Sequence, residues 1–344
     1  MPDNKVGIRG LILSNPAVSI MVLMSAASIA GLFAIFWARH AFANDFGVYW
    51  SISQTPTAAV YVPRLHNPFA YPPTMLLWVQ PLAWLPKWPA FFLWVGASIA
   101  ALIVATRKFL TPGGITLLLL CPPAFHCFST GQVSAALAAI LIAAFRSERK
   151  ELTGLLLAII ASVKPQYVLL APLYLMISRE WRILFWAGLA LMVIVGLTTG
   201  IFGGSIWSAW VRSFPNFHEV LIRDGVLNVA VTPAGVAENL GTPAIVAEIC
   251  GAVIGILIIL FARPSGPLEQ AAILSSASIL AAPYALVYDL MPMAPFLAMA
   301  ILNRRIGAAL ALSGALSPLP LLLTGWELVR SRFRSLDRWS ASGS

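Results

Sequence analysis

Charged residues are scarce in this chain: Asp, Glu, Lys and Arg make up 10% of its 344 residues, whereas 59% are hydrophobic. A soluble domain typically carries about 25% charged residues, so the composition argues against one. The hydrophobic residues form long runs separated by short basic clusters, which is typical of several membrane spans. The sequence therefore predicts an all-α polytopic integral membrane protein with about 10–12 transmembrane helices and external juxtamembrane helices.

Residues that would build a metal or nucleotide site are also missing. Only three cysteines occur, Cys121, Cys127 and Cys250, in or beside apolar runs and without metal-ligand spacing, so packing is their expected role. The chain has no Asp-x-Asp pair, no cluster of His, Cys and carboxylate residues, and no glycine-rich phosphate loop. We therefore expect no metal site and no cofactor.

The net charge of +9 raises the possibility of a nucleic-acid partner. The basic residues are scattered between apolar runs instead of forming one stripe, so we expect no nucleic acid and interpret them as a topology signal. Lys5 and Arg9 precede the first apolar run, Ala17 to Trp37, which is long enough to span the bilayer. The N-terminus is therefore expected in the cytoplasm and the residues after Arg39 outside.

The next apolar run, Tyr71 to Pro86, allows two arrangements. If it crosses the membrane, Arg107, Lys108 and the basic cluster at 146–150 all fall outside. If it lies along the external surface, all of them fall inside, as the positive-inside bias favours. We therefore predict that Tyr71 to Pro86 is an external interfacial helix.

On this map the chain is one transmembrane domain, residues 1–344. Residues 38–88 form a first external loop with interfacial helices, 203–242 a second external loop, and 325–344 a basic C-terminal tail. The run Ile306 to Thr324 either sends the tail outside or is turned back at Pro318 and Pro320, and both alternatives stay open.

Several hairpins are too short to cross the membrane twice. Leu152 to Ile177 offers 26 residues, whereas two spans need roughly 40. Its turn, Lys164-Pro165-Gln166, should therefore lie below the external surface. Irregular backbone at this depth is tolerated where it is buried in protein or lines a wet cavity, so we expect a shared vestibule open to the outside.

Three polar residues of the first external loop could carry chemistry. Asp45 is either a general base that takes a proton from an acceptor hydroxyl or an ordinary aspartate at a helix start. Arg64 and His66 either bind phosphate or sugar, or belong to a solvated loop.

Polar residues of the later hairpins are further candidates. A charge such as that of Lys164 is unfavourable in hydrocarbon, so we expect an anionic partner, either a lipid phosphate or a carboxylate such as Asp289. Tyr284 and Tyr288 lie beside that carboxylate and contact substrate or form part of an aromatic interface belt.

Short motifs occur in a characteristic order. They are Asp45-Phe46-x-x-Tyr49, Asn67-Pro68-Phe69-Ala70-Tyr71-Pro72-Pro73, Pro81-Leu82-x-x-Leu85-Pro86, Gly131-Gln132, Gly154 with Lys164-Pro165-Gln166, and Pro283 to Asp289. Together they resemble the polytopic glycosyltransferase family 87, which belongs to the C-type superfamily that uses polyprenyl-phosphate sugars. The resemblance runs from about residue 40 to residue 302. The family's Gly-x-x-Pro-Tyr pattern is replaced here by His66-Asn67-Pro68-Phe69.

The resemblance implies a catalytic carboxylate in the first external loop, Asp45, and a donor such as polyprenyl-phosphate mannose. It also implies inversion at the anomeric carbon without an obligatory metal. The expected substrate contacts are Tyr49, Arg64, His66, Tyr71, Gln132, Lys164, Gln166, Tyr284, Tyr288 and Asp289.

Two functions remain open. The first is a hexosyltransferase in the inner or plasma membrane, with a lipid or glycan acceptor, membrane lipids as its surroundings and an active site on the periplasmic or external side. The second is a flippase or transporter of lipid-linked sugar with a polar vestibule. A transporter would more usually show inverted repeats, and none is evident.

Overall fold

The computed structural model describes residues 14–39, 41–262, 264–314 and 317–341. In this part of the chain the regular structure is helical, apart from one isolated β-bridge between Ala230 and Leu286. Four helices are long and apolar enough to cross a membrane: α2 (Pro16–Arg39), α5 (Lys87–Thr106), α11 (Trp181–Phe202) and α14 (Ala244–Phe261). The predicted all-α polytopic membrane fold is confirmed.

A fifth candidate span is a bent pair. Helices α6 (Pro112–Leu120) and α7 (Pro122–Thr130) meet at 60°, where Pro122 and Pro123 break the helix. Other apolar runs form helices of 7 to 14 residues, too short to span alone. They are α8 (Ser134–Arg146), α9 (Lys150–Val163), α10 (Ala171–Ile177), α15 (Pro267–Leu280), α16 (Ala294–Leu302) and α17 (Ile306–Leu312). The described residues thus hold four or five candidate spans where we predicted about 10–12.

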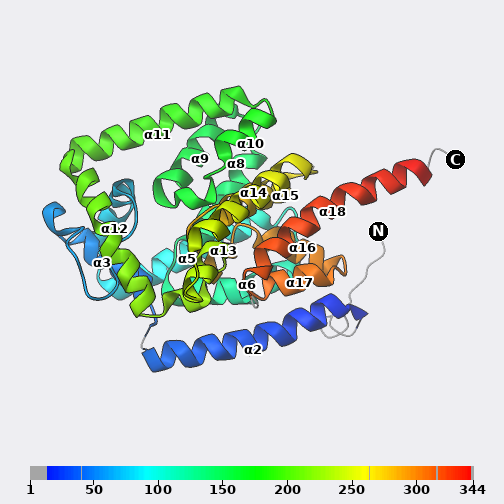
Figure 1. Cartoon of the computed structure of the whole chain (residues 1–344), viewed down its shortest axis with the longest axis horizontal. Coiled ribbons are helices and arrows are strands. Elements are labelled where there is room, and N and C mark those ends of the chain that lie inside the picture. The colour runs from blue at the N-terminus through cyan, green and yellow to red at the C-terminus, as the bar shows by residue number, and fades with distance from the viewer. Residues whose placement is uncertain (1–13, 40, 263, 315–316, 342–344) are drawn as a thin grey trace.

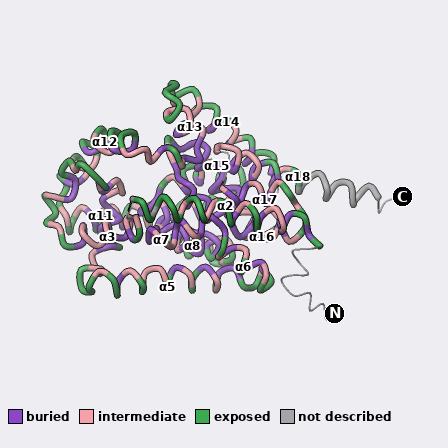
Figure 2. The backbone as a smooth tube through the Cα atoms, turned by 90° about the horizontal axis from the view of Figure 1, so that it is seen from below, coloured by how far each residue is buried: buried purple, intermediate pink, exposed green. Residues whose placement is uncertain are grey.

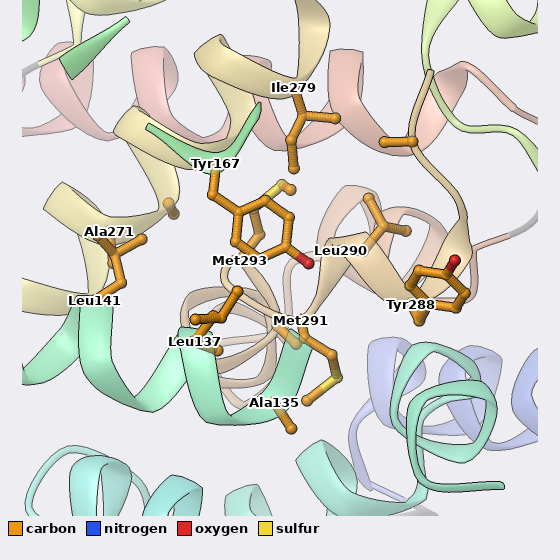
Figure 3. Packing of buried hydrophobic residues seen from close by; sticks show 14 of the residues in the cluster. Ala135, Leu137, Leu141, Tyr167, Ala271, Ile279, Tyr288, Leu290, Met291 and Met293 are labelled. Atoms are coloured by element: carbon orange, nitrogen blue, oxygen red, sulfur yellow. The ribbon is translucent and has the colours of Figure 1, made fainter. Parts of the chain in front are cut away.

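The short helices build the core, and the long ones lie around it (Figures 1 and 2). Most residues of α15 and α16 are buried, whereas only a small share of α2, α11 and α14 is buried inside the protein. Figure 3 shows Tyr167 between Ile279 of α15 and Leu137 of α8. This distribution is expected in a bilayer. Lipid solvates the outer helices, whereas protein must supply hydrogen-bond partners for the backbone groups that broken helices leave unpaired.

The basic clusters gather at one end of the molecule. An Arg146 Nη1 donates to the carbonyl of Ala105, 3.4 Å away, which joins the end of α8 to the end of α5. Lys150 pairs with Glu180 at 2.7 Å, so α9 and α11 begin at that same end. We call it the basic end; α2 and α11 run from it to the opposite end (Figure 1).

Tyr71 to Pro86 remains at the opposite end. The Trp50 indole N–H donates to the Leu85 carbonyl at 3.0 Å, and α5 then runs to the basic end. We predicted that this segment is one interfacial helix, and that prediction is wrong. The segment forms η2 (Pro73–Met75), α4 (Leu76–Val79) and η3 (Gln80–Trp84), because Pro81 lacks the N–H that a continuous helix needs.

The second predicted loop is mostly helical as well. It comprises α12 (Ser205–Arg223), η5 (Val226–Val229) and α13 (Pro233–Asn239). Helix α12 is strongly amphipathic. After α17 the chain turns back as α18 (Leu319–Ala341), where Glu327 lies 3.4 Å from the guanidinium of Arg305. Of the two alternatives for the C-terminal region, the structure has the one in which the chain turns back.

The turn after α9 is sunken. Gly154 lets α9 lie against α11, because an added Cβ would be 2.7 Å from the amide nitrogen of Ala187. Both helices start at the basic end, but α9 ends at Val163 while α11 continues to Phe202. From this register, Lys164 lies roughly 10 Å short of the end of α11. The short hairpin therefore sets the depth of the lysine.

Candidate functional site

A cavity of 840 Å³ opens at the end opposite the basic clusters. Side chains from α2, α3 (Asn44–Ser53), α7, α12, η5 and η6 (Val287–Leu290) line it, together with the turn at Lys164. Ten of the eleven residues that we singled out from the sequence are in this lining: Asp45, Tyr49, His66, Tyr71, Gln132, Lys164, Gln166, Tyr284, Tyr288 and Asp289. Arg64 is not among the lining residues.

Asp45 lies half-buried in the first turn of α3. The N-cap position belongs to Ala43, whose left-handed backbone (φ 54°) is held by its N–H donating to the Ser129 carbonyl at 2.8 Å. The aspartate therefore does not cap the helix through its side chain. A carboxylate in a first turn is still favoured by the helix dipole, and here it lines the cavity.

The environment of Asp45 acts on its charge in two directions. Burial raises the pKa of its carboxyl above the ordinary value of 3.8. Hydrogen bonds with Thr130 and Gln132 and the positive charge of Lys164 oppose that rise. The cavity thus holds a carboxyl that is more basic than one in water, as a general base near neutral pH requires.

Two tyrosines and one glutamine form a compact polar group beside the aspartate. The hydroxyls of Tyr49 and Tyr71 lie 2.6 Å apart, and each lies 3.0 Å from Oε1 of Gln132. The two rings also meet edge to face, with centroids 5.3 Å apart. This group fixes one wall of the cavity.

Lys164 and Asp289 form a buried ion pair in the cavity lining. Their exposed fractions are 3% and 2%, and Nζ lies 2.7 Å from Oδ1. The same carboxylate oxygen accepts from the hydroxyls of Tyr167 at 2.7 Å and Ser134 at 3.3 Å, while Oδ2 accepts the Leu286 N–H at 2.9 Å. Since four donors occupy the aspartate, it has little capacity left for a substrate hydroxyl.

The ammonium of Lys164 is enclosed as well. It lies 4.6 Å from the ring centre of Tyr288, 5.6 Å from that of Tyr167 and 5.9 Å from that of Tyr71. Of the two partners that the sequence left open, the structure has the carboxylate. A phosphate at this position would have to approach a charge that Asp289 already balances.

The loop after α3, which we predicted to be external, is tied to α12 at the mouth of the cavity. Backbone groups of Arg64 pair with the Asn216 amide in both directions, N–H to Oδ1 at 3.1 Å and Nδ2 to the carbonyl at 3.2 Å. His66 Nδ1 lies 3.2 Å from a carboxylate oxygen of Asp224. Arg64 therefore makes this contact through its backbone. Its charge and its place in the loop had led us to predict a contact with phosphate or sugar.

The polar residues of the cavity lining that we did not predict as site residues include Thr130, Arg223, Asp224 and Asn228. The last three lie just beyond or at the end of α12, on the segment that the sequence could not place. Thr130 directly precedes the Gly131-Gln132 motif, and this position in the sequence could have identified it as a site residue.

Within the described ranges, no group of three or more His, Cys, Asp or Glu side chains is placed to hold a metal ion. The side chains of the cavity are those of hydrogen-bonding and proton-transfer chemistry.

Gly131 sets the position of Gln132. It ends α7 with a left-handed backbone (φ 75°), and an added Cβ would lie 2.6 Å from Cβ of Phe46. We expect Gly131→Ala to lower the free energy of unfolding by about 2–4 kcal/mol, from backbone strain and overpacking. Thermal unfolding in detergent micelles would measure it. Gly188→Ala in α11, where an added Cβ meets nothing within 4 Å, is the control; equal losses in both variants would contradict the prediction.

Comparison with known protein families shows which family the chain resembles. The model of glycosyltransferase family 87 matches residues 69–288. This segment includes the Gly131 turn, the Lys164 turn and Tyr288, and it starts after Asp45. No curated protein and no solved structure matches the chain significantly.

Proposed function

The chain belongs to glycosyltransferase family 87, and from this premise we propose that it transfers a hexose, with mannose as the expected sugar, from a polyprenyl phosphate. The acceptor is a lipid or glycan at the external face of the cell membrane. The observation that carries the proposal is the state of the cavity carboxylates. Among the lining residues that are described, Asp289 pairs with Lys164 and Asp224 with His66, whereas Asp45 forms no ion pair.

Asp45 is the proposed general base. The acceptor hydroxyl oxygen forms a bond to the anomeric carbon from the face opposite the phosphate, while the carbon–oxygen bond to phosphate breaks. The hydroxyl proton passes to the Asp45 carboxylate, and polyprenyl phosphate leaves with the bonding electron pair. One displacement inverts the anomeric carbon, and the raised pKa of Asp45 suits a group that takes up this proton.

The cavity offers apolar and positive surface for a lipid phosphate. Leu32 and Ile35 of the membrane-spanning helix α2 contribute to its wall, which suits a hydrocarbon chain that stays in the bilayer. Arg223 and, when protonated, His66 also line it. Both pair with Asp224, at 3.1 Å and 3.2 Å, so two cations share one carboxylate there. Asp289 balances Lys164 alone, so Arg223 and His66 are better placed than the lysine to meet a phosphate.

The position of the basic end, opposite the cavity, supports an active site on the external side of the membrane. Arg146, Lys150 and Arg182 lie at that end, opposite the cavity. Since basic clusters favour the cytoplasmic side, the cavity would then face outward.

A transfer assay tests the proposal. The purified protein, given polyprenyl-phosphate hexoses and a membrane extract, is expected to release polyprenyl phosphate and to glycosylate an acceptor. Donors carrying mannose, glucose and galactose should be compared, because the sugar is a proposal. Movement of intact lipid-linked sugar between leaflets in vesicles, without donor cleavage by any acceptor or sugar, would support the flippase instead.

A further inference from the structure

Gln132 occupies a central place between the tyrosine pair and Asp45. It is buried, with 3% of its surface exposed. Its backbone is clamped at both ends: its N–H donates to the Cys127 carbonyl at 2.8 Å, and its carbonyl accepts from the Cys127 thiol at 3.3 Å. A side chain that starts from such a fixed backbone has few orientations to choose from.

The neighbours of the amide determine which way it points. Two tyrosine hydroxyls lie 3.0 Å from Oε1 of Gln132, and Asp45 is a hydrogen-bond neighbour of the same side chain. If the amide were flipped, its oxygen would face the carboxylate of Asp45, and two acceptors would meet. Only the orientation with Oε1 toward the hydroxyls gives Asp45 an N–H donor.

The other hydrogen-bond neighbour of Asp45 is a less constant donor. The hydroxyl of Thr130 lies 2.9 Å from the carbonyl of His126, which can take its single proton. Gln132 Nε2 carries two protons, and the tyrosine hydroxyls do not compete for them when they donate to Oε1.

We propose that Gln132 is a positioning residue for Asp45: the hydroxyls of Tyr49 and Tyr71 hold its carbonyl oxygen, and its amide N–H orients the carboxylate. This inference rests on the proposed role of Asp45 as base. It assigns the three residues to the orientation of the base, where the family resemblance implied substrate contacts.

Other charged and titratable groups surround the carboxylate, and all except Tyr49 and Tyr71 remain in place throughout the test below. They are Lys164 at the end of α9, Asp289 on η6, Tyr49 on α3 itself, His126 on α7, and Tyr71, Tyr284 and Tyr288. The substitutions therefore change hydrogen bonding to Asp45 and leave these charges unaltered.

The test is the pH dependence of kcat/KM for hexose transfer in wild type and in Gln132→Met. The rate falls on the acid side when Asp45 takes up a proton. Because a donor to the ionised form lowers the pKa, its loss should move this acid limb to higher pH by about one to two units. Tyr49→Phe with Tyr71→Phe should move it the same way by less. Tyr174→Phe, a buried tyrosine on α10 outside the cavity lining, is the matched control and should leave the limb in place.

A second measurement keeps the test independent of turnover. Infrared difference spectra can follow the protonated carboxyl band of Asp45, assigned by its loss in Asp45→Asn, and its midpoint should shift upward in Gln132→Met. An unchanged midpoint, or a raised KM with the acid limb in its wild-type position, would overturn the inference and return Gln132 to substrate binding. If wild type transfers no sugar, the proposed function fails, and the infrared midpoint still decides the role of Gln132.

Discussion

Asp45→Asn is expected to lower transfer about 10²–10⁴-fold, the usual contribution of a positioned general base. Asparagine keeps the shape of the side chain but cannot take up the acceptor proton. Turnover of a polyprenyl-phosphate hexose by the purified protein measures the effect. A variant whose turnover stays within a few-fold of wild type would remove Asp45 from the role of base.

The same substitution should leave the fold intact. The direction of its effect on stability follows from the pKa of Asp45. Burial raises the pKa of Asp45 above 3.8, so the folded state binds its proton more tightly than the unfolded state does. Stability is therefore lost as the pH rises from 3.8 through the folded pKa. Asp45→Asn lacks this loss, so its unfolding temperature at neutral pH should equal or exceed that of wild type. Glu180→Gln at the basic end, outside the cavity lining, is the control for a carboxylate outside the proposed chemistry, and it should retain most of the turnover.

Lys164→Met is expected to lower the free energy of unfolding by about 3–5 kcal/mol, because it leaves Asp289 charged and without its cation inside the protein. The lysine and aspartate side chains are 4% and 3% exposed. Transfer should also fall sharply, since the pair is part of the cavity lining and its charges act on Asp45. Thermal or urea unfolding in detergent measures the first effect and the transfer assay the second.

Two controls separate the buried pair from ion pairing in general. Lys150→Met breaks a pair whose side chains are 40% and 36% exposed, and it should change stability by only about 0–1 kcal/mol. Adding Asp289→Asn to Lys164→Met removes the unpaired charge and should recover part of the lost stability. A Lys164→Met protein as stable as Lys150→Met would show that the buried pair does not carry the predicted energy.

The sequence by itself determined the class of fold and picked out residues that the structure brings together around one cavity. Scarce charge and long apolar runs are local properties, and the bilayer acts on them directly, so a helical membrane protein follows from composition. The basic clusters indicated that Tyr71 to Pro86 stays on one side, and the structure has α5 running from that segment to the basic end. The short hairpin likewise indicated a sunken Lys164, because the length of a helix is set by its residue count.

The partners of each polar group were decided by tertiary structure. Asp289 lies 125 residues from the lysine that it pairs with, and Gln132 lies 83 residues from Tyr49. No local pattern selects such partners; packing of the broken helices around one cavity does. The same packing directs Arg64 to Asn216 and turns the second external loop into α12. Hydropathy acts along the chain and therefore indicated a helical membrane protein, although not the number of its spans, whereas the hydrogen-bond partners of buried charges depend on which segments meet in space.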